Sequence, residues 1–204
     1  MNPKTTAIVF QGAQVDFCTP EGKLYPLLEA QLIARNFVPK LVDLIQKALE
    51  LGIRVYNVPI MFTPDFSEIK NAEGILGAIR EAGAFAQGTR GADPIDEILP
   101  FKDRIQTLEP KRGLCAFGTT DLDKRLREDG IETVAVCGLL TNVCVETTAR
   151  TAYDLGYRIT ILNDVTATRT PEEQAASENF MFPLLGKTVP MEEFLAQFEA
   201  PAKA

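Results

Sequence analysis

Cys144 is the residue of this 204-residue chain best placed for covalent chemistry. It follows an apolar run at 132–137 that is typical of a strand, and it lies where a helical pattern begins. The positive end of a helix dipole favours a negatively charged thiolate in the first turn. The chain contains no histidine, so no imidazole activates this sulfur.

The cysteine spacing and the absence of histidine exclude several kinds of site. Cys18, Cys115, Cys137 and Cys144 show no CxxC spacing, which argues against a disulfide framework and against an all-cysteine zinc site. Without histidine, zinc sites that use His and the Ser-His-Asp or Cys-His arrangements are also excluded. We therefore expect no metal and no cofactor.

Length, composition and charge predict one globular domain over residues 1–204. Hydrophobic residues make up 46% and charged residues 24%, as in ordinary globular proteins. The net charge is −7 and there is no basic run, so neither nucleic acid nor an anionic membrane is an expected partner. The sequence shows no signal-peptide pattern and no spanning apolar segment, which predicts a cytoplasmic location.

The elements that must position Cys144 alternate between strands and helices. The strand patterns are apolar throughout, which is typical of a parallel sheet covered on both faces. Functional residues of such sheets gather at the carboxyl ends of the strands, so Gln11, the segment 60–62, Lys111 and Cys144 are expected to lie together. The expected strands are 6–10, 54–60, 105–108, 133–137, 158–162 and 188–189, and the expected helices include 31–51, 74–82, 120–128 and 171–185.

Three sequence blocks together resemble the isochorismatase-like cysteine hydrolases, a family that includes nicotinamidases and N-carbamoylsarcosine amidases. The blocks are 10–17 (FQGAQVDF), 111–117 (KRGLCAF) and 138–145 (GLLTNVCV). The resemblance implies an α/β three-layer sandwich, a Rossmann-like fold with a six-stranded parallel sheet and helices on both faces. It also implies a homodimer or homotetramer that acts on a small molecule.

Family membership would give Cys144 and Lys111 catalytic roles. Cys144 matches the nucleophile that attacks an amide-like carbonyl, and Lys111 matches a lysine whose ammonium stabilises the thiolate. The family also has a non-proline cis peptide, which would lie between Leu139 and Leu140. The backbone N–H groups of Leu140 and Cys144 would then form the oxyanion hole.

Position 12 departs from the family pattern, because Gly12 stands where the catalytic aspartate is expected. A glycine cannot return a proton to an amine leaving group, which amide hydrolysis needs. Four explanations are open: a binding protein with impaired catalysis, a substrate whose leaving group needs less help, a substitute carboxylate from Asp16 or Asp164, or an introduced change.

The pocket and its substrate are less defined by sequence. Phe17, Phe62 and Phe66 are candidates to line an apolar pocket. Family nicotinamidases hold a metal with histidines that this chain lacks, so nicotinamide is a poor first guess. The sequence predicts a cysteine hydrolase of a C–N (amide-like) bond, and the alternatives are a small-molecule binding or regulatory protein and a thiol-reactive sensor.

Overall fold

A sheet of parallel strands forms the centre of the protein, as seen in a computed structural model that describes residues 1–70 and 73–198. Within those residues the sheet has six strands in the order β3-β2-β1-β4-β5-β6, which confirms the predicted α/β architecture. The strands are β1 Thr6–Gln11, β2 Arg54–Val58, β3 Gln106–Thr107, β4 Thr133–Leu139, β5 Arg158–Ala167 and β6 Gly186–Val189.

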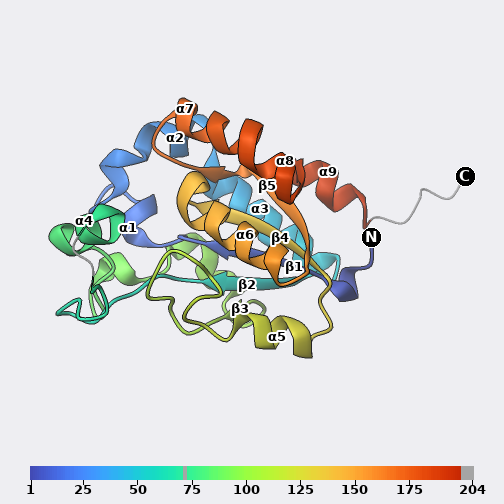
Figure 1. The fold of residues 1–204 in the computed structure, drawn as a ribbon, viewed down its shortest axis with the longest axis horizontal. Helices are drawn as coiled ribbons and strands as arrows, with labels where there is room; N and C mark the ends of the chain where they lie inside the picture. Colours follow the sequence, from blue (N-terminus) through green and yellow to red (C-terminus); the bar gives the residue numbers. More distant parts are fainter. Residues whose placement is uncertain (71–72, 199–204) are drawn as a thin grey trace, which may run out of the picture.

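Helices cover both faces of this sheet, with α6 on the near side in Figure 1 and α3 on the far side. The α-helices are α1 Val15–Cys18, α2 Glu29–Ala34, α3 Phe37–Glu50, α4 Gly74–Ala82, α5 Leu122–Glu128, α6 Glu146–Asp154, α7 Pro171–Ala176, α8 Phe182–Leu185 and α9 Met191–Ala196. Two π-helices, η5 Thr141–Val145 and η6 Ser177–Met181, and four 3-10 helices, η1 Pro3–Thr5, η2 Tyr25–Leu27, η3 Arg90–Ala92 and η4 Asp96–Phe101, complete the order.

The sheet separates two hydrophobic cores. Ile8 and Phe10 of β1 face the larger core, which is shared with α3 and α9. Ala7 and Val9 alternate with them and face a smaller core that is shared with α5, α6 and α8. Side chains alternate between the two faces of a strand, so each residue of β1 belongs to one core.

The helix expected over 31–51 is two helices in the structure, α2 and α3. They are joined through Asn36, which has φ 52° in the left-handed region. A continuous helix would place Pro39 in its interior, where proline removes a hydrogen bond and clashes with the preceding turn. Beginning α3 at Phe37 puts Pro39 in the first turn, where its missing N–H costs nothing.

Other boundaries differ less from the expectation. Strand β5 continues to Ala167, past the predicted end at 162, and β4 continues to Leu139. The helix predicted over 171–185 begins as expected, because Pro171 occupies its first turn and the hydroxyl of Thr170 accepts from the backbone N–H of Glu173 at 3.2 Å. The π-helix η6 then interrupts it before α8.

Candidate functional site

The carboxyl ends of the central strands bring the predicted residues together. Gln11 ends β1 and pairs with Gly138 of β4. Lys111 lies beside the end of β2, because its N–H donates to the carbonyl of Pro59 at 2.8 Å and its carbonyl accepts from the N–H of Met61 at 3.2 Å. The gathering expected from a parallel sheet is therefore confirmed.

Lys111 is a buried cation, with 1% of its surface exposed. Its Nζ donates to Oε1 of Gln11 and to the carbonyl of Leu114, both at 2.6 Å. No carboxylate in residues 1–70 and 73–198 forms an ion pair with it. Burial of an ammonium without an anion is costly, so this environment favours a negative charge nearby.

Gln11 connects that lysine to the turn that carries Cys144. Its Nε2 donates to the carbonyl of Cys144 at 3.3 Å and to Oγ1 of Thr148 at 3.1 Å. Thr148 itself accepts from the N–H of Ala116 at 2.9 Å, which ties in the loop after Lys111. The side chain of Gln11 is fully buried, so this amide forms the fixed centre of the site.

Cys144 lies in the π-helix η5, between β4 and α6, rather than in the first turn of an α-helix. The cis peptide predicted between Leu139 and Leu140 is present. Cys144 is 5% exposed. Among the described residues, no protein acceptor takes the backbone N–H of Leu140, which leaves that donor available for a ligand.

Polar contacts from α7 and from Thr168, which follows β5, hold the Cys144 turn in place. Oγ1 of Thr141 donates to Oε1 of Gln174 at 2.6 Å, and both residues are buried. Oγ1 of Thr168 donates to Oδ1 of Asn142 at 2.7 Å. The segment before Cys144 is therefore anchored through its side chains.

Close approach of β1 and β4 explains the glycine at position 138. An added Cβ there would lie 2.2 Å from the carbonyl oxygen of Gln11 and 2.6 Å from its nitrogen, so only glycine allows this contact. Gly138 also has φ +108°, a conformation that residues with side chains rarely adopt.

Neighbouring side chains fill the space beside Gly12, the position at which the family pattern has an aspartate. A Cβ at Gly12 would lie 2.9 Å from Cβ of Leu139 and 3.2 Å from Cδ2 of Phe17, and the backbone has φ +76°. The side chain that reaches Lys111 belongs to Gln11, one residue earlier. An aspartate introduced at position 12 would thus meet both strain and steric overlap.

The two substitute carboxylates considered from sequence are engaged elsewhere. Oδ2 of Asp16 accepts from the N–H of Phe85 at 2.6 Å, and its Oδ1 accepts from the N–H of Lys23 at 3.0 Å. Asp164 accepts from Nζ of Lys40 at 3.0 Å and from the N–H of Met191 at 2.8 Å. Both carboxylates hold loops and helix ends rather than contacting Cys144 or Lys111.

A cavity of about 450 Å³ opens beside the Cys144 turn. Apolar side chains form most of its wall, including Phe17, Leu28, Ile79, Leu140 and Val143, and Asn142 and Arg169 are its polar members. Phe17, one of the three aromatic residues proposed to line a pocket, thus lies in the wall of this cavity.

The other two predicted pocket aromatics do not line this cavity. Phe62 is fully buried and packs against Phe66, with ring centroids 5.9 Å apart. Both belong to the larger core.

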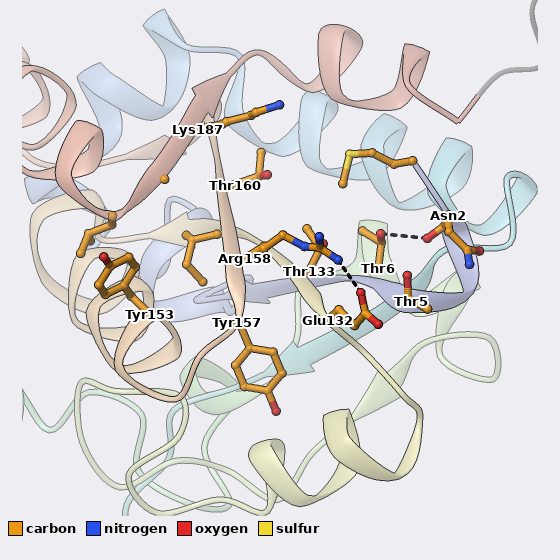
Figure 2. A pocket seen from close by; sticks show the side chains of 14 residues that line it. Asn2, Thr5, Thr6, Glu132, Thr133, Tyr153, Tyr157, Arg158, Thr160 and Lys187 are labelled. Atoms are coloured by element: carbon orange, nitrogen blue, oxygen red, sulfur yellow. Dashed lines mark hydrogen bonds and ion pairs between the residues drawn. The ribbon is translucent and has the colours of Figure 1, made fainter.

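A larger hollow of about 740 Å³ lies at the opposite, amino-terminal ends of the strands. Figure 2 shows its polar lining, in which Arg158 pairs with Glu132 and the hydroxyl of Thr6 donates to Asn2. Thr133, the first residue of β4, and Thr160, the third residue of β5, line it there. None of the predicted catalytic residues lines this hollow.

The remaining thiols have ordinary packing roles. Burial raises the pKa of Cys18 to about 12, and burial also raises the pKa of Cys137. Sγ of Cys115 lies 3.2 Å from Oγ1 of Thr151. In the described part of the chain, no group of three metal-ligating Cys, Asp or Glu side chains is gathered, and no helix is long and apolar enough to cross a membrane.

The sequence places Gln11 at this edge of the sheet, but it does not predict the contacts that Gln11 makes in the site. A signal for these contacts existed, because Ala7, Val9 and Gln11 alternate along β1 and share one face. A polar residue at the end of a fully buried strand, on the face covered by the helix after Cys144, requires a polar partner there.

Comparison with known proteins gives consistent matches. The isochorismatase domain family matches residues 6–193. An uncharacterized isochorismatase family protein of Bacillus subtilis is 44% identical over 117 residues, which cover 55% of this chain and 61% of that protein. The chain thus spans less than two thirds of that relative.

Solved structures match over most of the chain. A cysteine hydrolase from Pseudomonas syringae superposes with a TM-score of 0.84 at 25% identity, covering 97% of this chain and 94% of that one. The N-carbamoylsarcosine amidase of Thermoplasma acidophilum superposes with a TM-score of 0.71 at 26% identity, covering 92% and 97%.

Proposed function

The chain belongs to the isochorismatase family of hydrolases, and from this premise we propose that it cleaves a C–N bond of a small amide-like molecule through Cys144. The observation that carries the proposal is the buried chain of contacts from Lys111 through Gln11 to the Cys144 turn. The structural relative that acts as an N-carbamoylsarcosine amidase supports the choice of a C–N bond.

In the proposed reaction, the thiolate of Cys144 attacks the carbonyl carbon of the substrate. The carbonyl oxygen becomes negatively charged and accepts hydrogen bonds from the backbone N–H groups of Leu140 and Cys144. The intermediate expels the nitrogen and leaves a thioester on Cys144, which water then hydrolyses. Lys111 supplies the positive charge that favours both the thiolate and the intermediate.

The neighbouring cavity supports the proposal of a small substrate with an apolar part. Its volume of about 450 Å³ lies in the range of small-ligand pockets. Its mostly apolar wall fits a hydrocarbon or ring portion, and Asn142 and Arg169 offer hydrogen bonds to a polar group.

A second candidate function is binding without turnover. It is favoured by one observation: the side chains that contact Lys111 and Gln11 within the described residues include no carboxylate. A ligand would then occupy the same cavity, and Cys144 would contribute packing alone.

Alkylation of Cys144 separates these candidates. We expect iodoacetamide at pH 7 to label Cys144 in the native protein at least about tenfold faster than in the urea-unfolded chain, because a thiolate reacts and a thiol does not. Peptide mapping by mass spectrometry identifies the labelled residue. Cys18 and Cys137 serve as internal controls, since burial raises the pKa of each thiol.

Turnover is tested on a panel of small amides and ureides with the wild type and Cys144→Ala. We expect release of amine or ammonia that disappears in the variant. Equal alkylation of Cys144 in the native and unfolded chains would contradict the hydrolase proposal and favour binding alone.

A further inference from the structure

The site lacks an evident donor for the proton that the leaving nitrogen requires. An amine leaves a tetrahedral intermediate readily only when it is protonated. Gln11 is neutral, Gly12 has no side chain, and Asp16 and Asp164 hydrogen bond elsewhere. The donor must therefore be sought among the groups that contact Gln11.

Lys111 is the titratable side chain in contact with Gln11. The other titratable groups near these segments have partners that hold them away. Arg112 donates to Met61 and pairs with Glu68, Sγ of Cys115 lies against Thr151, and Glu146 accepts from Ser177 and Arg150.

The geometry of the Lys111 amine leaves one bond available for chemistry. An ammonium has three N–H donors. Two of them are directed at Oε1 of Gln11 and at the carbonyl of Leu114, each at 2.6 Å. Among residues 1–70 and 73–198 the third has no protein acceptor, so it is free for a substrate atom.

The orientation of Gln11 is fixed by its neighbours. Lys111 can only donate, so Oε1 must face it, and Nε2 is then left to face the carbonyl of Cys144. Oγ1 of Thr148 contacts both ends of the amide, at 3.1 and 3.3 Å. One buried amide thereby sets the position of the lysine relative to the nucleophile turn.

We propose that Lys111 is the proton carrier of the reaction and that Gln11 is the positioning residue that aims it. This inference rests on the proposed hydrolase function. It assigns to a lysine and an amide the task for which the family pattern uses a carboxylate.

The proposed reaction moves protons among Cys144, Lys111, the leaving nitrogen and water. The resting site holds the Cys144 thiolate and the Lys111 ammonium, whose proton came from the thiol, and the sulfur bonds to the carbonyl carbon. As the C–N bond breaks, Lys111 returns this proton to the leaving nitrogen. Water next attacks the thioester and gives its proton to Lys111, and the C–S bond breaks to release the acid and restore the thiolate and ammonium.

The test uses 4-nitrophenyl acetate, whose phenolate leaves without needing a proton. The acetylation of Cys144 gives a rapid burst of 4-nitrophenolate and leaves Lys111 protonated. Steady turnover then requires Lys111 to lose its proton to the solvent and to take a proton from the attacking water. In Lys111→Arg the charge remains but the guanidinium cannot be deprotonated. We expect the burst to stay within about threefold of wild type and the turnover to fall at least about 100-fold.

Mass spectrometry should then show acetylated Cys144 accumulating in Lys111→Arg. Lys187→Arg, at the amino-terminal end of β6, is the matched control and should behave as wild type. If burst and turnover fall by the same factor in Lys111→Arg, or if turnover is unchanged, the proton-carrier role is wrong. If the wild type shows no burst, the proposed function itself is wrong.

Gln11→Glu gives a second measurement, which does not require the buried position 111 to accommodate the larger arginine side chain. A carboxylate beside Nζ holds Lys111 in its charged form, so deacetylation should reach half of its maximal rate at a higher pH than in wild type. A purely structural role of Gln11 would leave that midpoint unchanged. A faster deacetylation at neutral pH would instead show that a carboxylate is the better carrier and would overturn the proposal.

Discussion

Gln14 joins three segments of the chain through one side-chain amide. Its Nε2 donates to the carbonyls of Ile60 and Ala92, both at 2.8 Å, and its Oε1 accepts from the N–H of Ile60 at 2.9 Å. The residue is 2% exposed, so no water replaces these bonds. The loops after β1 and β2, on which the site rests, are connected by this one residue.

We expect Gln14→Leu to lower the free energy of unfolding by about 2–4 kcal/mol, because three buried backbone groups would lose their partners. Urea denaturation followed by circular dichroism measures the change. Gln46→Leu is the matched control: Gln46 contacts Glu50 at the surface, and the expected change there is within about 0.5 kcal/mol. Equal stability of the two variants would contradict the role assigned to Gln14.

At the residue scale, the sequence suggests which side chains could carry chemistry, but it does not describe the space around them. Cys144 and Lys111 are identified by residue type and by their sequence blocks. The crowding at Gly12 depends on Leu139 and Phe17, which approach it only in the folded chain. No local pattern reports such a contact, so the choice between Gly12 and Gln11 required the structure.

The junction between α2 and α3 shows how a helix boundary is set at the scale of elements. Apolar residues continue at helical spacing across it, and for that reason the sequence predicts one helix. The break depends on Pro39 in α3 and on Asn36, which adopts the left-handed conformation at φ 52° and ψ 43°. Periodicity reports which face is buried, and it does not report where the backbone turns.

Asn36→Ala should lower the free energy of unfolding by about 1 kcal/mol, because a Cβ-bearing residue other than Asn or Asp is strained in this region. Asn36→Gly should leave stability nearly unchanged, since glycine adopts this conformation freely. Thermal or urea unfolding of the pair provides the measurement. If Ala and Gly prove equally stable at this position, the left-handed junction does not constrain the fold.

At the scale of the whole molecule, the parallel sheet is predictable because the central strands are largely apolar and helices separate the strands along the chain. The strand order β3-β2-β1-β4-β5-β6 cannot be predicted from any local segment of the sequence, because it depends on which strands pair in the folded chain. The absence of histidine affects the pH dependence of the whole molecule, because histidine is the side chain whose ordinary pKa lies between pH 5 and 8.

Stability should therefore be nearly constant between about pH 5 and 8 and should fall below about pH 4. Burial alone would raise the pKa of Asp129, but hydrogen bonds from Tyr56 and Gln106 and the charges of two arginines lower it overall. A hydrogen bond from Arg169 lowers the pKa of Glu173. Lowered folded-state pKa values mean that the stabilisation is present above the unfolded-state pKa and is lost as pH falls.

Urea denaturation at a series of pH values measures this dependence. Asp129→Asn should flatten the acidic limb, because the variant has one fewer carboxylate to protonate on unfolding. On the alkaline side stability should fall as pH rises. Burial raises the pKa of Cys18 to about 12, so above the ordinary thiol pKa the unfolded chain loses this proton more readily than the folded protein does. An acidic limb of Asp129→Asn as steep as that of wild type would contradict this account.

The two cores on either side of the sheet contribute different parts of the site. The apolar cavity residues Phe17, Leu28 and Ile79 belong to the larger core, whereas Val145, next to Cys144, belongs to the smaller one. Residues that share no partners contribute to stability additively. Substitutions of these three cavity residues should therefore change ligand preference while the contacts of Gln11 with Thr148 on the other side of the sheet stay intact. This separation makes the fold open to divergence and to redesign.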